Sequence, residues 1–266
     1  MARTTAERRS NLPAELSSFV GRRHELASVR TGLTAHRLVT LLGPGGVGKT
    51  RLAFRAAADQ ERGLDDGAWV AELAPVTLPE LVPETVVGAL GIRSAEGGSP
   101  TQRLVAHLRD RQLLLVLDNC EHVQEAAAAL AAEVLSSCPG VRILVTSRHA
   151  LALPGELVLN VPPLPTPGPD RVAGSPEALM HYDAVRLFVD RATASWSSFR
   201  VTSVNQDALA ELVRRLDGIP LAIELAAVRV RSLTVEQILH RLSDRFALLS
   251  RGSRAALPRQ QTLQAL

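Results

Sequence analysis

The stretch GPGGVGKT, residues 43–50, combines residue types that bind phosphate. Its glycines allow backbone N–H groups to approach anionic oxygens without a side-chain clash. Lys49 adds an ammonium group, and the hydroxyl of Thr50 can ligate Mg²⁺. The spacing fits the pattern G-x-x-x-x-G-K-[ST] and predicts a loop that holds ATP or ADP with Mg²⁺. The predicted nucleotide-binding residues of this loop are Pro44, Gly45, Gly46, Val47, Gly48, Lys49, Thr50 and Arg51.

Lys49 is the only lysine in a sequence that contains 30 lysine and arginine residues. A guanidinium is planar and bulky, whereas an ammonium on a flexible stem can reach phosphate oxygens at close quarters. We therefore expect Lys49 to contact the β- and γ-phosphates as a catalytic residue.

Asp118 ends the apolar run LLLVLD, where a magnesium-binding aspartate would follow a buried strand. A strand-ending aspartate can also be a helix cap. Many hydrolysing enzymes with this loop have a second carboxylate at the next position, but this chain has Asn119, which predicts slow hydrolysis. Glu121 either replaces that carboxylate or is a first-turn residue favoured by a helix dipole.

Arg148 follows the run VRILVT in the segment TSR. At the edge of a sheet its side chain can reach a γ-phosphate and distinguish ATP from ADP. A solvated loop arginine is the alternative, because arginine is abundant in this chain.

A strand must enter the phosphate-binding loop and a helix must leave it, and the flanking sequence meets both requirements. Further apolar runs alternate with helical patterns, which predicts an α/β fold with a doubly wound parallel sheet. The ligand of such a sheet lies beyond the carboxyl ends of its strands. The predicted strands are residues 37–42, 67–73, 113–118, 141–146 and 157–161. The predicted helices are residues 24–33, 49–61, 78–90, 100–109 and 121–136.

The segment PPLPTPGPDRVAGSP, residues 162–176, is rich in proline and glycine and predicts a domain boundary. Only helical patterns follow it, so the second domain should be small and all-helical. The first dozen residues lack apolar periodicity and predict a mobile tail. The helices expected in the second domain are residues 183–194, 206–216, 221–229, 235–242 and 245–249. The expected divisions are a tail over 1–18, a P-loop domain over 19–170, a helical domain over 171–250 and a linker over 251–266.

The composition, with 46% apolar and 21% charged residues, indicates a globular protein. The net charge of +3 comes from scattered arginines, so we expect no direct nucleic-acid contact by this chain. It has neither an apolar stretch long enough for a membrane helix nor a secretory signal, which predicts a cytoplasmic protein with no membrane partner. Cys120 and Cys138 have no metal-binding spacing and read as packing residues.

Six segments occur in the order found in the NB-ARC branch of the STAND signalling ATPases. The chain resembles the form present in large bacterial transcriptional regulators, of actinobacterial type, in the LuxR-type and antibiotic-regulatory groups. The segments are FVGRRHEL (19–26), GPGGVGKTRLA (43–53), LLLVLDNCEHV (113–123), ILVTSR (143–148), GIPLAIELAA (218–227) and ALPRQQTL (256–263).

The resemblance implies roles that spacing alone does not. Val20, Gly21 and Arg22 would line the adenine and ribose, while Pro220 and Leu221 would close over the base. Without the resemblance, the Gly-Ile-Pro segment is explained as a turn between two helices. The resemblance also implies that Arg148 is the sensor of the γ-phosphate.

Members of this family continue into a winged-helix domain, superhelical repeats and often a DNA-binding module. The resemblance therefore implies that this chain is a fragment, with DNA contact supplied by domains beyond it. It also implies that the full-length protein associates with itself in the ATP state.

Together these features predict a regulatory switch. ADP would hold the two domains together, and ATP would alter contacts at Lys49, Asp118 and Arg148 so that the helical domain rotates. The alternative is an AAA+-type, ring-forming ATPase with fast turnover, which ordinarily needs the acidic pair that Asn119 removes. A small-molecule kinase is a third class, but no acceptor pocket or lid sequence is evident.

Overall fold

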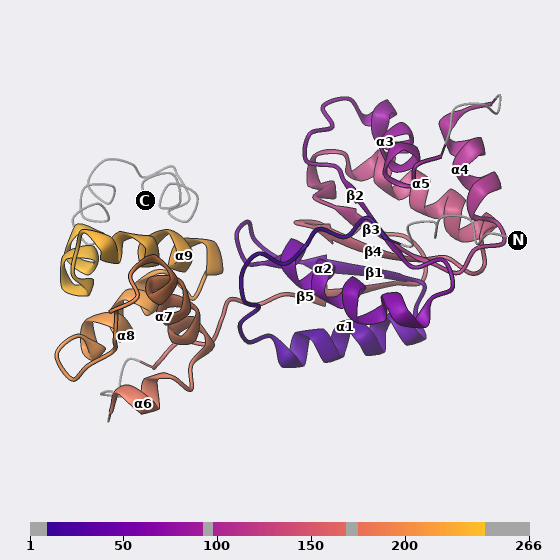
Figure 1. The fold of residues 1–266 in the computed structure, drawn as a ribbon. Helices are drawn as coiled ribbons and strands as arrows, with labels where there is room; N and C mark the ends of the chain where they lie inside the picture. The colour runs from indigo at the N-terminus through magenta and orange to yellow at the C-terminus, as the bar shows by residue number, and fades with distance from the viewer. Residues whose placement is uncertain (1–9, 93–97, 169–174, 243–266) are drawn as a thin grey trace, which may run out of the picture. The chain divides into compact units, whose positions relative to one another are not determined.

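The computed structural model describes residues 10–92, 98–168 and 175–242 (Figure 1). The chain divides into two compact units. Among the described residues, one unit comprises those within 10–16, 22–45 and 49–161, and the other those within 17–21, 46–48 and 162–242. The expected helix over residues 245–249 lies outside the described residues.

A five-stranded sheet forms the centre of the first unit, in the order β2-β3-β4-β1-β5. Every neighbouring pair of strands is parallel. Chain order and sheet order differ, so the connections must cross over the faces of the sheet. The strands are β1 Leu38–Leu42, β2 Ala68–Glu72, β3 Leu114–Asp118, β4 Arg142–Ser147 and β5 Glu156–Asn160.

Helices cover both faces of this sheet (Figure 1). Leu115 and Leu117 of β3 pack in a core with residues of the α3, α4 and α5 helices. Leu114 and Val116 must face the opposite side, because successive side chains of a strand alternate. All of β3 is buried, as expected for a central strand. The helices of the first unit are α1 Arg23–Ala35, α2 Lys49–Gln60, α3 Val82–Ala89, α4 Pro100–Leu108 and α5 Gln124–Ser137, and its 3-10 turns are η1 Glu61–Gly63, η2 Pro79–Leu81 and η3 Cys120–His122.

The N-terminal residues differ from the expected mobile tail at positions 10 and 11. Ser10 forms a parallel bridge with Ala68. The side chain of Asn11 accepts a hydrogen bond from Val70 N at 2.7 Å and donates one to Val70 O at 2.8 Å. An amide side chain can pair with a strand as a peptide group would, and apolar periodicity does not detect this.

The described part of the second unit is helical from residue 176 onward. Its core surrounds Phe188, whose ring meets that of Phe199 edge-on with centroids 5.8 Å apart. The α7 and α9 helices pack against each other. The elements are α6 Pro176–Leu179, α7 Asp183–Ser195, α8 Gln206–Arg215, α9 Pro220–Val228, the 3-10 turn η4 Arg229–Arg231, and a helix over residues 235–242.

Among the described residues, no helix combines the length and the apolar character that crossing a membrane requires.

Candidate functional site

Three neighbouring strands deliver the predicted phosphate-site residues to one edge of the sheet. The β1 strand leads into the loop that begins at Gly43, β3 ends at Asp118, and β4 leads to Arg148. The β4 strand lies between β1 and β3, and all three are parallel. Their carboxyl ends therefore meet at the same edge, where ligands of open parallel sheets bind.

Asp118 is held by two hydroxyl groups. Thr50 Oγ1 donates to Asp118 Oδ1 at 2.7 Å, and Thr146 Oγ1 donates to the same oxygen at 2.6 Å. Thr146 Oγ1 in turn accepts a hydrogen bond from Asn119 N at 2.9 Å. Asp118 is thus linked to both the first turn of α2 and the end of β4.

Thr146 is a site residue that sequence reasoning missed. It is a hydroxyl residue at the carboxyl end of a strand that runs beside β3, one residue after the register pair Leu117 and Val145. Thr146 is a polar residue in the apolar run VRILVT, which could have marked it as a site residue. Its closeness to Asp118, however, could be predicted only if β4 were known to lie beside β3.

Lys49 is buried at the start of α2, with 8% of its surface exposed. Its Nζ donates to Gly43 O at 2.9 Å and to Pro44 O at 3.1 Å. Burial lowers the pKa of Lys49, while the charge of Glu121 acts in the opposite direction. A buried cation whose hydrogen bonds go to neutral carbonyl groups is well suited to an anion.

The donor set fits a nucleotide with Mg²⁺. The glycine-rich loop leads into the N-terminus of α2, where backbone N–H groups and the helix dipole favour phosphate. Gly46 and Gly48 have positive φ angles of 75° and 96°, which a side chain would strain. Thr50 and Asp118 provide hydroxyl and carboxylate oxygens, the ligand type that Mg²⁺ prefers. Arg51 follows in the same helical turn.

Asn119 occupies the left-handed region, with φ 64° and ψ 54°. Asparagine tolerates this conformation better than most residues, so the backbone supplies a sufficient reason for its presence. The turn leads to Glu121, whose Oε1 accepts a hydrogen bond from Arg148 Nε at 3.0 Å. Arg148 therefore lies at the edge of the sheet where the phosphate site is predicted, paired with a carboxylate.

The predicted adenine-site residues near the N-terminus are shaped by close approaches. Gly21 has φ 71°, and a side chain there would collide with Asp183 of α7. Val20 packs against the apolar core of the second unit. Arg22 is buried, has φ 63°, and pairs with Glu25 at 3.2 Å in the first unit.

Pro220 and Leu221 form the first turn of α9 in the second unit. The preceding Gly218 has φ 64°, and its O accepts a hydrogen bond from Leu164 N at 2.9 Å. A side chain at Gly218 would collide with the carbonyl of Leu164. The Gly-Ile-Pro turn therefore has a structural role, to which a proline at the first helical position is suited.

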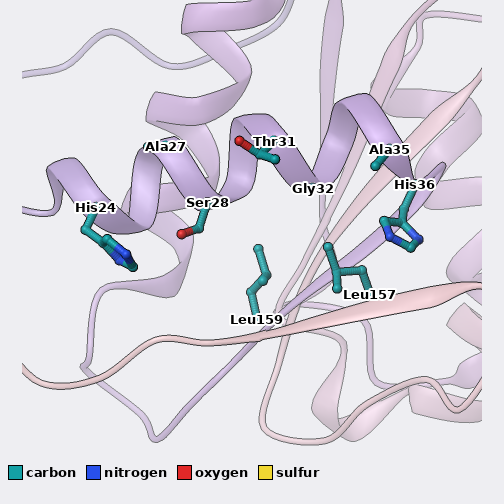
Figure 2. Close-up of a pocket in the computed structure, with 9 residues that line it drawn as sticks. All are labelled: His24, Ala27, Ser28, Thr31, Gly32, Ala35, His36, Leu157 and Leu159. Carbon is teal, nitrogen blue, oxygen red and sulfur yellow. The ribbon is translucent and has the colours of Figure 1, made fainter.

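A cavity of about 410 Å³ lies between α1 and the edge strand β5 (Figure 2). Small residues of α1 face it, and a side chain at Gly32 would approach Leu157 to 2.8 Å. The cavity is lined by His24, Ala27, Ser28, Thr31, Gly32, Ala35, His36, Leu157 and Leu159. None of the predicted nucleotide-site residues lines it, so it is distinct from the predicted phosphate site.

No protein-family model matches this sequence. The chain is 42% identical over 250 residues to an uncharacterized protein of Mycobacterium tuberculosis, covering 94% of this chain and 60% of that protein. It is 43% identical over 237 residues to a candidate HTH-type transcriptional regulator of the same organism, covering 89% of this chain and 25% of that protein. It is also 30% identical over 263 residues to the regulatory protein AfsR of Streptomyces coelicolor, covering 91% and 24%. The chain thus spans only part of the length of these relatives.

Two solved structures share the architecture. A Walker-type ATPase of Pyrococcus abyssi has a TM-score of 0.56 at 16% identity, covering 88% of this chain and 74% of that one. A STAND protein (Signal Transduction ATPase with Numerous Domains) with a tetratricopeptide repeat sensor, from Pyrococcus horikoshii, has a TM-score of 0.52 at 16% identity, covering 95% and 40%. The chain has the P-loop NTPase fold, an α/β doubly wound parallel sheet followed by helices, and the predicted fold class is confirmed.

Proposed function

We propose that this chain is an ATP- and ADP-binding switch with slow hydrolysis, of the NB-ARC type, within a signal-dependent transcriptional regulator. The observation that carries the proposal is the paired arrangement of Thr50 and Asp118, 2.7 Å apart, beside the buried ammonium of Lys49. Hydroxyl, carboxylate and ammonium groups at a helix N-terminus form a set suited to a Mg²⁺-bound polyphosphate.

In this proposal the loop over residues 44–51 and Lys49 hold the phosphates, and Thr50 and Asp118 hold Mg²⁺. Bound Mg²⁺ would neutralise charge on the β- and γ-phosphates. Arg148 would contact the third phosphate of ATP. Val20, Gly21, Arg22, Pro220 and Leu221 would contact the nucleoside.

Slow hydrolysis follows from the turn after β3. The amide side chain of Asn119 cannot accept a proton from water as a carboxylate can. The backbone N–H of Asn119 donates to Thr146 Oγ1. We therefore expect turnover below the typical range of about 1 to 10³ per second.

The regulatory part of the proposal is supported by the relatives, one described as a candidate HTH-type regulator and another as a regulatory protein. DNA binding would come from parts of a longer protein outside this chain. Self-association would accompany the ATP state of that full-length protein.

The proposal is tested by measuring the affinity of the purified chain for ADP and for a non-hydrolysable ATP analogue by calorimetry with Mg²⁺. Lys49→Ala should abolish binding of both nucleotides, because the loop then lacks its cation. Arg148→Ala should spare ADP and weaken the analogue. Equal loss of both nucleotides in Arg148→Ala would refute the sensor role.

Steady-state turnover and oligomeric state separate the switch from a ring-forming AAA+ motor. Turnover below one per second, without a nucleotide-dependent hexamer in size-exclusion chromatography, is expected for the switch. Turnover inside the typical enzyme range together with a hexamer would favour the motor. ADP released on denaturation of the purified chain would support a resting switch that retains its ligand.

A further inference from the structure

The ion pair between Glu121 and Arg148 leaves one carboxylate oxygen without a partner. Arg148 Nε donates to Glu121 Oε1 at 3.0 Å, but Glu121 Oε2 is buried and accepts no hydrogen bond. The Glu121 side chain is 16% exposed, whereas that of Arg148 is 45% exposed. A mostly buried negative charge therefore has a single, more exposed guanidinium as its hydrogen-bond partner.

This carboxylate acts on the phosphate-binding lysine. Among the charges that affect the pKa of Lys49, Glu121 has the largest influence, ahead of Arg148 and Asp118. Arg148 also lies against the glycine-rich loop, since a side chain at Gly45 would approach Arg148 Nη2 to 3.2 Å. Glu121 and Arg148 thus belong to the electrostatic environment of Lys49.

We propose that Glu121 is a specificity-determining residue that favours ADP over ATP at this site. The inference rests on the proposed function, in which Lys49 and Arg148 contact the γ-phosphate. A γ-phosphate that drew the guanidinium of Arg148 from Glu121 would leave the buried carboxylate without its hydrogen-bond partner. It would also bring further negative charge toward the same carboxylate. ADP lacks the γ-phosphate, so it neither draws Arg148 from Glu121 nor adds that negative charge.

The test is the ratio of two dissociation constants, that of a non-hydrolysable ATP analogue divided by that of ADP, measured with Mg²⁺ by calorimetry on the full 266-residue chain. Glu121→Gln keeps the size of the side chain and an oxygen that can accept from Arg148, but removes the charge. We expect the ratio to fall on the order of tenfold, the scale of one like charge removed near a partly exposed anion. Affinity for ADP should change much less.

Glu125→Gln is the matched control. Glu125 lies in the first turn of α5, is exposed, and loses the same charge on substitution. Its ratio should equal that of the unsubstituted chain. Glu121→Asp keeps the charge but shortens the reach to Arg148. Its ratio should lie below that of the unsubstituted chain and above that expected for Glu121→Gln. This variant also tests the inference if Glu121→Gln does not fold.

A dependence on Arg148 distinguishes this role from a general charge effect. In an Arg148→Ala background, Glu121→Gln should lower the ratio by a smaller factor, because no guanidinium remains to be released. A ratio that Glu121→Gln leaves unchanged while ADP still binds would overturn the inference. Loss of hydrolysis at an unchanged ratio would also overturn it, and would assign Glu121 to orienting water instead. Failure of the unsubstituted chain to bind either nucleotide would refute the proposed function rather than the role of Glu121.

Discussion

Thr146 Oγ1 donates a 2.6 Å hydrogen bond to Asp118 Oδ1, the oxygen that also accepts from Thr50. The same hydroxyl accepts from Asn119 N, so one group satisfies the carboxylate at the end of β3 and the turn that follows it. Thr40, on neighbouring β1, is equally buried, but its hydroxyl has no hydrogen-bond partner. We therefore expect the hydroxyl of Thr146 to stabilise the fold and that of Thr40 to lower its stability.

Replacing each threonine with valine should separate these roles. Thr146→Val removes the donor to Asp118 and the acceptor for Asn119 N, so the free energy of unfolding should fall by about 1–3 kcal/mol. Thr40→Val replaces an unpaired hydroxyl with a methyl group and should leave stability unchanged or raise it by about 1 kcal/mol. Denaturant unfolding followed by the fluorescence of Trp69 in β2, in a Trp196→Phe background, reports on the first unit. Equal destabilisation by both changes would show that the hydroxyl pairing is not what stabilises this edge.

The sequence predicted the central elements because their signals are local. The apolar runs that became β1, β3 and β4 and the glycine-rich loop each follow from residue type and spacing. The α3 and α5 helices begin four and three residues later than predicted, because the short 3-10 turns η2 and η3 precede them. Such turns share the apolar spacing of the helix they precede.

Contacts between residues of different strands could not be predicted from the sequence. The pairing of Thr146 with Asp118 and the bonding of Asn11 to Val70 depend on which segments become neighbours, and a single sequence does not encode strand order in a local pattern. Arg148 directly follows β4, but its pairing with Glu121 depends on the left-handed turn at Asn119, which no local sequence pattern indicates.

Because Lys49 is the only lysine, amine acylation followed by peptide mass spectrometry reports on one side chain. Lys49 is buried, so it should react slowly in the folded chain and quickly in denaturant. If the proposed function holds, ADP with Mg²⁺ should slow the reaction about tenfold or more, because a phosphate would pair with the ammonium and favour its protonated form. The α-amino group of the chain serves as the internal control, and its rate should not depend on ADP. Equal labelling of Lys49 with and without bound ADP would exclude it from the phosphate site.

The two cysteines should be unreactive in the folded chain. Both are fully buried, and burial raises the pKa of each thiol. A raised pKa lowers the fraction of thiolate, the reactive form, at any given pH. A disulfide-exchange reagent at pH 8 should therefore detect no thiol in native protein and two per chain in denaturant. Rapid reaction of either thiol in the native protein would contradict the packing role.

The same shifts predict how stability depends on alkaline pH. Above the ordinary thiol value of 9.0, the unfolded chain releases thiol protons that the folded chain retains. The free energy of unfolding should then fall as pH rises, since the native state binds more protons. Cys120→Ala and Cys138→Ala should each reduce this slope. A slope that neither variant changes would assign the pH dependence to other groups.

Gly218 should be the most sensitive position of the turn before α9. Its φ of 64° is unfavourable for a side chain, and an added Cβ would collide with Leu164 O. Gly218→Ala should therefore lower the stability of the second unit by about 1–3 kcal/mol. Gly168→Ala is the control within the same unit, because a Cβ there meets no atom within 4 Å. The fluorescence of Trp196 in a Trp69→Phe background follows unfolding of this unit, and a Gly218→Ala midpoint equal to that of Gly168→Ala would show that the turn can adopt another backbone conformation at little cost.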